Sequence, residues 1–153
     1  MKRFLLALPF LLFFIISCGD DTREIREFIV QNQSPVEISG ITRIESDTLD
    51  PLTKKFKFEI SNLSDTKINS VSAGLVMMDS EGKPVFGILE RSFTELNIWP
   101  GEKITQEIAL KDPNTESIVL LIKSIRYKDP NTKKIVTFDN PEFEKKMHEI
   151  FPK

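Results

Sequence analysis

Phe56-Lys57-Phe58-Glu59-Ile60-Ser61-Asn62 is the stretch that decides the fold, because apolar and polar residues alternate strictly along it. Successive side chains of a β-strand point to opposite faces, so this spacing predicts one buried face and one solvated face. Turn-forming residues follow from Asn62 to Lys67 and end the strand. The stretch therefore predicts a strand of an antiparallel sheet that is covered on one side.

Similar segments lie on both sides of this strand. They predict strands over residues 36–44 (with a bulge or bend at Gly40), 71–78, 83–89, 104–111, 118–127 and 135–138. Residues 90–98 fit either an irregular segment or a short strand, and Trp99-Pro100-Gly101-Glu102 fits a type II turn. Because strands do not alternate with helices, the pattern predicts an all-β antiparallel sandwich of about seven strands over residues 35–139.

The end of the chain changes period and predicts an amphipathic C-terminal helix over residues 140–153. Its apolar stripe is Phe143, Met147, Ile150 and Phe151. Asn140 is expected to cap the helix, because a side-chain oxygen at that position accepts a backbone N–H of the first turn.

Two predicted strands are apolar on both faces. Val76 and Met78 lie opposite Leu75 and Met77, and Val119 and Leu121 alternate with a second apolar set, Ile118, Leu120 and Ile122. A sandwich strand normally has one polar face, so the outer face needs a cover. We expect the C-terminal helix to dock on it; the alternative is that helix and face bind a partner protein.

The first 17 residues have the layout of a secretory signal. Met1-Lys2-Arg3 is basic, an apolar run follows from Phe4 to Ile16, and a small residue, Ser17, precedes the only cysteine, Cys18. The run is shorter than the roughly 20 apolar residues that a spanning helix needs.

Ile15-Ile16-Ser17-Cys18 resembles the lipobox of bacterial lipoproteins. The resemblance implies that the Cys18 thiol receives a diacylglyceryl group, that cleavage falls between Ser17 and Cys18, and that acyl chains such as palmitate anchor the chain to a membrane. Residues 18–34 then form the lipidated cysteine and its tether. The residue after the cysteine is Gly19 and not the aspartate that marks inner-membrane retention, so the outer membrane of the bacterial envelope is favoured. This residue does not distinguish between the two leaflets. A plain signal peptide with a free thiol and an apolar helix of a cytosolic protein are the alternatives.

Composition limits the remaining possibilities. Removal of the first 17 residues leaves 136, the size of one domain with a tether, and changes the net charge from −2 to −4 because Lys2 and Arg3 are lost. An acidic chain argues against a nucleic-acid partner and against binding to an anionic lipid surface, since either would call for a basic patch. With Cys18 lipidated, no thiol remains for a disulfide.

A second resemblance covers roughly residues 36–138. Phe-x-Phe-x-Ile-Ser-Asn from Phe56, a turn, a strand from Val71, Asp79-x-x-Gly82 and a later Pro-Gly-Glu turn are similar to the small immunoglobulin-like domains of envelope lipoproteins, of the FxLYD type. The resemblance implies an immunoglobulin-like sandwich and an envelope location. It implies no catalytic residue.

No catalytic, cofactor-binding or metal-binding residue is predicted. The single histidine, His148, is expected on the polar side of the helix, and zinc sites need several Cys or His ligands. Asp20-Asp21 and the Asp47/Asp50 pair lack the spacing of a calcium loop. Trp99 suits stacking on a sugar, although a core aromatic at a sheet corner is the favoured interpretation.

These observations predict a non-enzymatic, membrane-anchored envelope lipoprotein that acts as an interaction or structural module. Its expected partners are the membrane, through the lipid on Cys18, and an envelope protein. The alternative is a surface-exposed lipoprotein that binds a ligand or matrix. A carboxylate pair for hydrolysis can be distant in sequence and leave no local motif. A small hydrolase is nevertheless less favoured, because the domain is small and shows no sign of a cleft.

Overall fold

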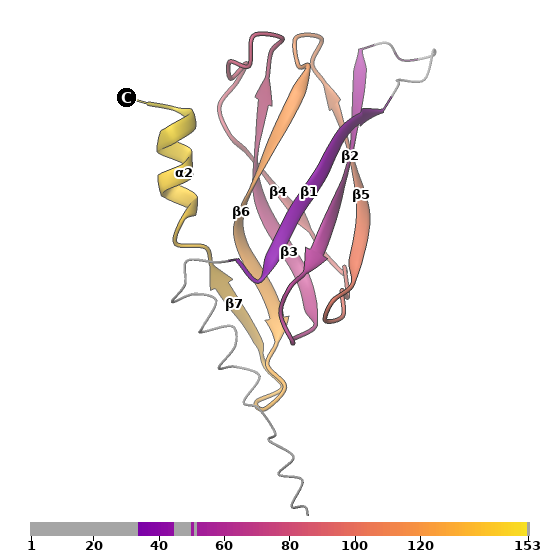
Figure 1. Ribbon diagram of the computed structural model, residues 1–153, viewed down its shortest axis with the longest axis vertical. Helices are drawn as coiled ribbons and strands as arrows, with labels where there is room; N and C mark the ends of the chain where they lie inside the picture. Colours follow the sequence, from indigo (N-terminus) through magenta and orange to yellow (C-terminus); the bar gives the residue numbers. More distant parts are fainter. Residues whose placement is uncertain (1–33, 45–49, 51, 153) are drawn as a thin grey trace, which may run out of the picture.

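The computed structural model describes residues 34–44, 50 and 52–152. Two antiparallel sheets pack face to face (Figure 1). The first contains β1 (Val36–Ile44), β2 (Thr53–Asn62) and β5 (Lys103–Lys111), in the order β1-β2-β5. The second contains β3 (Ile68–Met78), β4 (Leu89–Phe93), β6 (Ser117–Lys128) and β7 (Ile135–Asp139), in the order β4-β3-β6-β7. The predicted immunoglobulin-like antiparallel β-sandwich is confirmed, with a short C-terminal helix, α2 (Phe143–Ile150).

The alternating stretch of β2 forms the centre of the core. Phe56, Phe58 and Ile60 are almost completely buried, as the period of two predicts, and they join the inward side chains of the opposite sheet in one cluster. The rings of Phe58 and Phe93 meet edge to face with centroids 5.4 Å apart, a favoured geometry for aromatic pairs. Packing of the two sheets therefore fixes the register of β2.

The bend predicted in β1 is confirmed. Gly40 has φ +63°, a backbone conformation that glycine adopts without steric cost, and the β1–β2 register shifts between Ser39 and Thr42. The expected turn from Asp47 to Pro51 lies mostly outside the described residues.

The strand predicted over residues 83–89 is wrong. Within residues 83–88 the one bridge is that of Pro84 with Met78, and the Val85 N–H donates to the Met77 carbonyl at 2.9 Å. Pro84 has no N–H with which to extend a ladder. The chain rejoins β3 at Leu89, so part of the segment left open in the sequence is strand β4.

The outer face of the β3/β6 sheet is covered in part by α2, which follows β7 (Figure 1). A Cβ added at Gly74 of β3 would lie 3.0 Å from Cε2 of Phe143 and 3.3 Å from a methyl carbon of Ile88. Val76, two residues further along the same face, is fully buried. Phe143, the first residue of the predicted apolar stripe, thus packs on this face as expected. Ile88 of the β3–β4 connection covers the same face.

The cap predicted for the helix is wrong in detail. The helix begins at Phe143, and its N-cap residue, Glu142, makes no side-chain cap hydrogen bond. The Asn140 side chain accepts from the Glu142 N–H at 3.1 Å and donates to the Ile122 carbonyl of β6 at 2.8 Å. Asn140 therefore fastens the turn before α2 to the sheet and lies outside the helix.

Candidate functional site

The candidate site lies at the end of the sandwich where β1 begins, around Trp99. The turn that carries Trp99 is the predicted type II turn: the Glu102 N–H donates to the Trp99 carbonyl at 3.0 Å, and Gly101 has φ +74°. The Glu102 carboxylate also accepts from the backbone N–H of Trp99 at 3.1 Å. Ile98, the preceding residue, is fully buried and pairs with Ile68. The backbone is thus held on both sides of Trp99.

The favoured interpretation of Trp99 as a core aromatic is wrong. Its side chain is 57% exposed. The Lys67 ammonium group lies 4.7 Å from the centroid of the indole ring, within the range of a cation–π contact. The alternation at this corner turns Ile98 inward and leaves Trp99 on the surface.

Asn62 connects the turns at this end. The residue is 1% exposed, and its amide donates to the carbonyls of Thr66 and Ile98 at 2.8 and 3.0 Å. Its side-chain oxygen accepts from the N–H and the hydroxyl of Ser64 at 2.9 and 2.8 Å. Its backbone carbonyl accepts from the Gly101 N–H at 3.1 Å. The sequence identifies Asn62 only as a turn residue, because two of its partners, Ile98 and Gly101, are distant in the chain.

A hollow of about 450 Å³ opens beside Trp99. Its lining combines the indole, two prolines, three lysines and two aspartates: Asp65, Lys67, Trp99, Pro100, Lys128, Asp129, Pro130 and Lys133, together with Thr66. Asp129 accepts hydrogen bonds from the backbone N–H groups of Asn131 and Thr132, and the bond from Thr132 is the main reason that its pKa lies below the ordinary value. The carboxylate is thus used to hold its own turn.

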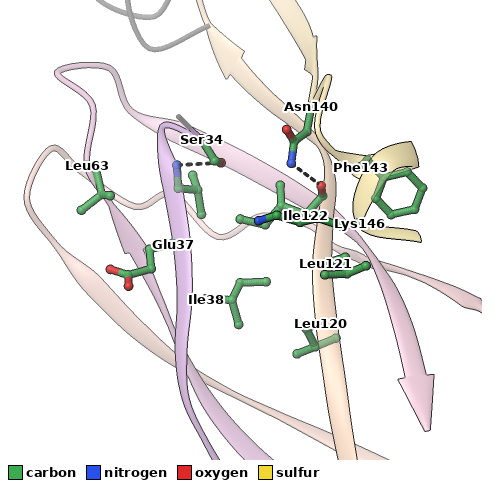
Figure 2. Close-up of a pocket in the computed structure, with 11 residues that line it drawn as sticks. Ser34, Glu37, Ile38, Leu63, Leu120, Leu121, Ile122, Asn140, Phe143 and Lys146 are labelled. Atoms are coloured by element: carbon green, nitrogen blue, oxygen red, sulfur yellow. Dashed lines mark hydrogen bonds between the residues drawn. The ribbon is translucent and has the colours of Figure 1, made fainter. Parts of the chain in front are cut away.

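A second hollow, the lateral groove, runs between β1 and β6 and has a volume of about 500 Å³. Figure 2 shows Ile38 of β1 and Leu120 of β6 pointing toward one another across it, with Phe143 at one side. Because β7 pairs with β6 only from Ser124 onward, the earlier half of β6 borders this groove without a neighbouring strand on that side among the described residues.

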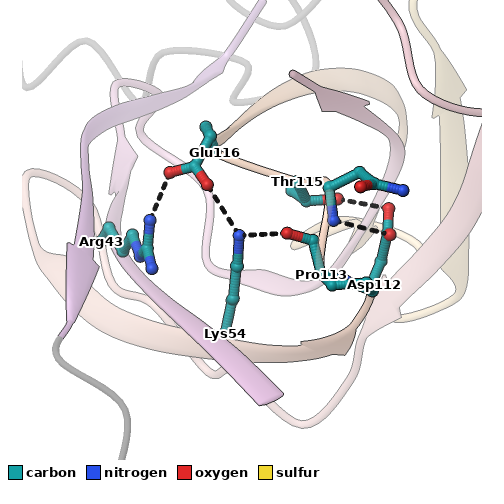
Figure 3. A network of polar contacts seen from close by, with 7 residues as sticks. Arg43, Lys54, Asp112, Pro113, Thr115 and Glu116 are labelled. Carbon is teal, nitrogen blue, oxygen red and sulfur yellow. Dashed lines mark hydrogen bonds and ion pairs between the residues drawn. The ribbon is translucent and has the colours of Figure 1, made fainter. Parts of the chain in front are cut away.

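The opposite end of the sandwich contains a polar network (Figure 3). Lys54 is 6% exposed, and its ammonium group donates to the Pro113 carbonyl at 2.7 Å and to Glu116 at 2.8 Å. Glu116 also pairs with Arg43. The hydrogen bond from Lys54 is the main cause that lowers the pKa of Glu116. Every charge in this network has a partner, so we assign it a structural role.

Few of the residues singled out in the sequence lie in the described part of the chain. Ser17, Cys18 and the Asp20-Asp21 pair lie outside the described residues, as does Asp47. Asp50 accepts a hydrogen bond from the Thr53 hydroxyl at 2.7 Å. His148 is exposed and lines a crevice of about 350 Å³ between α2 and the β3–β4 connection. Over residues 34–44, 50 and 52–152, no group of three or more His, Cys, Asp or Glu side chains is placed to hold a metal.

Within the described part of the chain, no helix has the length and apolar character required to cross a bilayer. No protein-family model matches this chain, and no curated protein matches it.

Several solved structures are similar at low identity. One is a DUF1425 family member from a Shewanella species, with a TM-score of 0.43, 13% identity, and coverage of 57% of this chain and 75% of that one. Another is the putative ApaA protein of Bordetella pertussis, with a TM-score of 0.38, 13% identity and coverage of 69% and 87%. A third is cj0090 of Campylobacter jejuni, with a TM-score of 0.37, 16% identity and coverage of 56% and 82%. With TM-scores below 0.5, these likenesses extend to no functional residue.

Proposed function

We propose that this chain is a lipid-anchored protein of the bacterial cell envelope whose β-sandwich is a non-enzymatic binding or structural module. The observation that carries the proposal is the apolar run that ends at Ile15-Ile16-Ser17-Cys18, which resembles a lipobox. Several acyl chains on one residue bind a bilayer firmly, because each buried methylene contributes roughly 0.8 kcal/mol. The proposed partners are the membrane and an envelope protein, with the outer membrane favoured by Gly19.

The geometry of the domain supports a binding role over catalysis. The described carboxylates and lysines with shifted pKa values make hydrogen bonds within turns or ion pairs between strands, as Asp112 does with the Thr115 hydroxyl and Lys123 with Glu90. Such groups stabilise local structure. The exposed indole of Trp99 beside an open hollow is, by contrast, suited to contact with another molecule.

Metabolic labelling with a fatty-acid analogue tests the anchor. The native chain should incorporate the label, and Cys18→Ser should abolish both labelling and cleavage of the precursor. A matched control restores a single cysteine outside the motif: the double variant Cys18→Ser with Ser34→Cys should remain unlabelled and uncleaved. Undiminished labelling of either variant would remove the basis of the proposal.

A surface-exposed ligand- or matrix-binding protein is the second candidate, and the exposure of Trp99 favours it. The two candidates differ in the side of the membrane on which the domain lies. Digestion of the domain by a protease added to intact cells would support the second candidate, whereas digestion only after the outer membrane is opened would support an internal envelope module.

A further inference from the structure

Three turns and the start of β1 meet at one end of the sandwich, which we call the tether end. It comprises Pro35 and residues 63–67, 99–102 and 129–135 (Figure 1). The Leu63 N–H donates to the Pro35 carbonyl at 2.9 Å, which ties the chain entering β1 to the β2–β3 turn. Residues 18–33, which lead from the proposed lipid on Cys18, therefore join the domain at this end.

The tether end carries three large apolar side chains that are left on the surface. Leu63 is 51% exposed, Trp99 57% and Ile135 51%. These are three of the five exposed large apolar residues in the described part of the chain; the other two are Leu52 and Phe86. Leu63 and Trp99 come from two different turns and Ile135 is the first residue of β7, so the three side chains are separate apolar contacts and do not form one enclosed pocket.

Lysines accompany these side chains. Lys67 lies over the Trp99 ring, and Lys128 and Lys133 line the hollow next to it. Indole rings and the long stems of lysines are favoured at the boundary between hydrocarbon and headgroups, where one part is apolar and the other polar. Asp65 and Asp129 lie at the same end, so the net attraction to anionic headgroups is small and the apolar contacts dominate.

We propose that the tether end rests on a lipid bilayer, with Trp99 and Leu63 inserted at the headgroup boundary. The proposal rests on the anchor at Cys18, because Ser34 follows Cys18 by 16 positions and this stretch spans at most about 55 Å. A tether of this reach keeps the domain close to the membrane, and a weak intrinsic affinity then suffices for docking. We favour a bilayer over a sugar for two reasons. The Lys67 ammonium group occupies one side of the indole ring. The exposed side chains of Leu63 and Ile135 lie outside the hollow that Trp99 lines.

The chain from Gly19 to Lys153 allows docking to be tested without the lipid. Among the described residues, all the buried members of the core lie from Val36 to Phe138, so this chain retains that core. Trp99 is the only tryptophan and reports directly on its surroundings. With vesicles of phosphatidylethanolamine and phosphatidylglycerol, its emission should shift to the blue and should be quenched by brominated lipid. Because apolar contacts dominate, the effect should change little between low and moderate salt.

A pair of leucine variants makes the test specific for the tether end. Leu63→Ser should reduce vesicle partitioning, measured by cosedimentation, by roughly tenfold, since it removes one large apolar side chain from the contact. Leu52→Ser is the matched control, because Leu52 is 60% exposed and lies beside Thr53, at the other end of β2. This control should partition like the parent chain. Trp99→Ala should lose partitioning by tenfold or more, for the same reason.

Three results would overturn the docking proposal: no spectral shift or quenching with vesicles, equal losses for the two leucine variants, or protection of Trp99 by a soluble oligosaccharide and not by vesicles. The proposal of lipid attachment at Cys18 and the proposal of docking can be refuted separately. A chain that is labelled at Cys18 but ignores vesicles without its lipid contradicts docking alone. A chain that docks but is never labelled supports docking and contradicts the anchor.

Discussion

Replacement of Asn62 by alanine tests whether one buried amide organises the tether end. The side chain makes four hydrogen bonds, two as a donor to the carbonyls of Thr66 and Ile98 and two as an acceptor from Ser64. Asn62 is 1% exposed, so water cannot take the place of the lost amide without rearrangement of the loop.

The expected magnitude follows from what each partner retains. The Ile98 carbonyl still accepts from the Ile68 N–H at 2.9 Å. Loss of Asn62 frees the single hydrogen of the Ser64 hydroxyl, which lies 3.1 Å from the Thr66 carbonyl and can donate to it. The Ser64 N–H donates to the Asn62 side chain and has no second acceptor among its described hydrogen bonds. A buried donor left without a partner costs about 1–3 kcal/mol. With the lost volume added, the free energy of unfolding should fall by about 2–4 kcal/mol, a large part of the 5–15 kcal/mol typical of a domain.

Urea unfolding followed by Trp99 emission measures this change, with circular dichroism as an independent probe. The midpoint should fall with an unchanged slope, and the melting temperature should fall by on the order of 10 °C. Asn114→Ala is the matched control, because Asn114 is an exposed asparagine on a turn at the other end and should change stability by less than about 0.5 kcal/mol. If Asn62→Ala is as stable as this control, the network does not hold the turns together.

Asn62→Asp separates the hydrogen bonds from the shape of the side chain. The carboxylate keeps the acceptor for Ser64 but faces the two carbonyl oxygens of Thr66 and Ile98, so burial and repulsion raise its pKa in the folded state above the unfolded value of about 3.9. Stability from the protonated form is present below the unfolded pKa and is lost as the pH rises through the folded pKa. The difference from the parent chain should therefore be larger at pH 7 than at pH 4; a difference independent of pH would contradict this reasoning.

The remaining predictions concern the helix and the polar network. Phe143→Ala should lower the melting temperature and increase binding of a hydrophobic dye, because the ring covers Gly74; the exposed Glu149→Ala serves as the control, and equal behaviour of the two would show that the helix is not docked. Lys54→Met should reduce the pH dependence of stability near pH 4. Lys54 lowers the pKa of Glu116, so the contact between them contributes stability to the folded state. That stability is present above the unfolded pKa of Glu116 and is lost as the pH falls through its folded pKa. Acid unfolding curves of the two chains check this, and superimposable curves would refute it.

The sequence predicts those parts of the fold in which local periodicity agrees with burial. β2 alternates without interruption, so its buried face could be identified from Phe56, Phe58 and Ile60 alone. The outer face of β3 was predicted to need a cover because Val76 breaks the alternation. The strand over residues 83–89 was predicted wrongly, since the place where a chain leaves one partner and rejoins it depends on tertiary pairing, as the single bridge at Pro84 shows.

The position of Trp99 was harder to predict, because the segment before it has no regular period. Glu95 and Asn97 both have left-handed backbones, with φ 57° and 52°, so alternation cannot be followed from Leu96 to Trp99. Once Ile98 pairs with Ile68 and is buried, the next side chain turns to the surface. The Trp99 turn is fixed by its own hydrogen bonds to Glu102, and the exposed indole adds little packing to the core. A large apolar ring that the core does not bury and the backbone holds at the surface is available for contact with another molecule. The proposed partner should therefore be sought at the tether end and not at the well-paired network at Lys54.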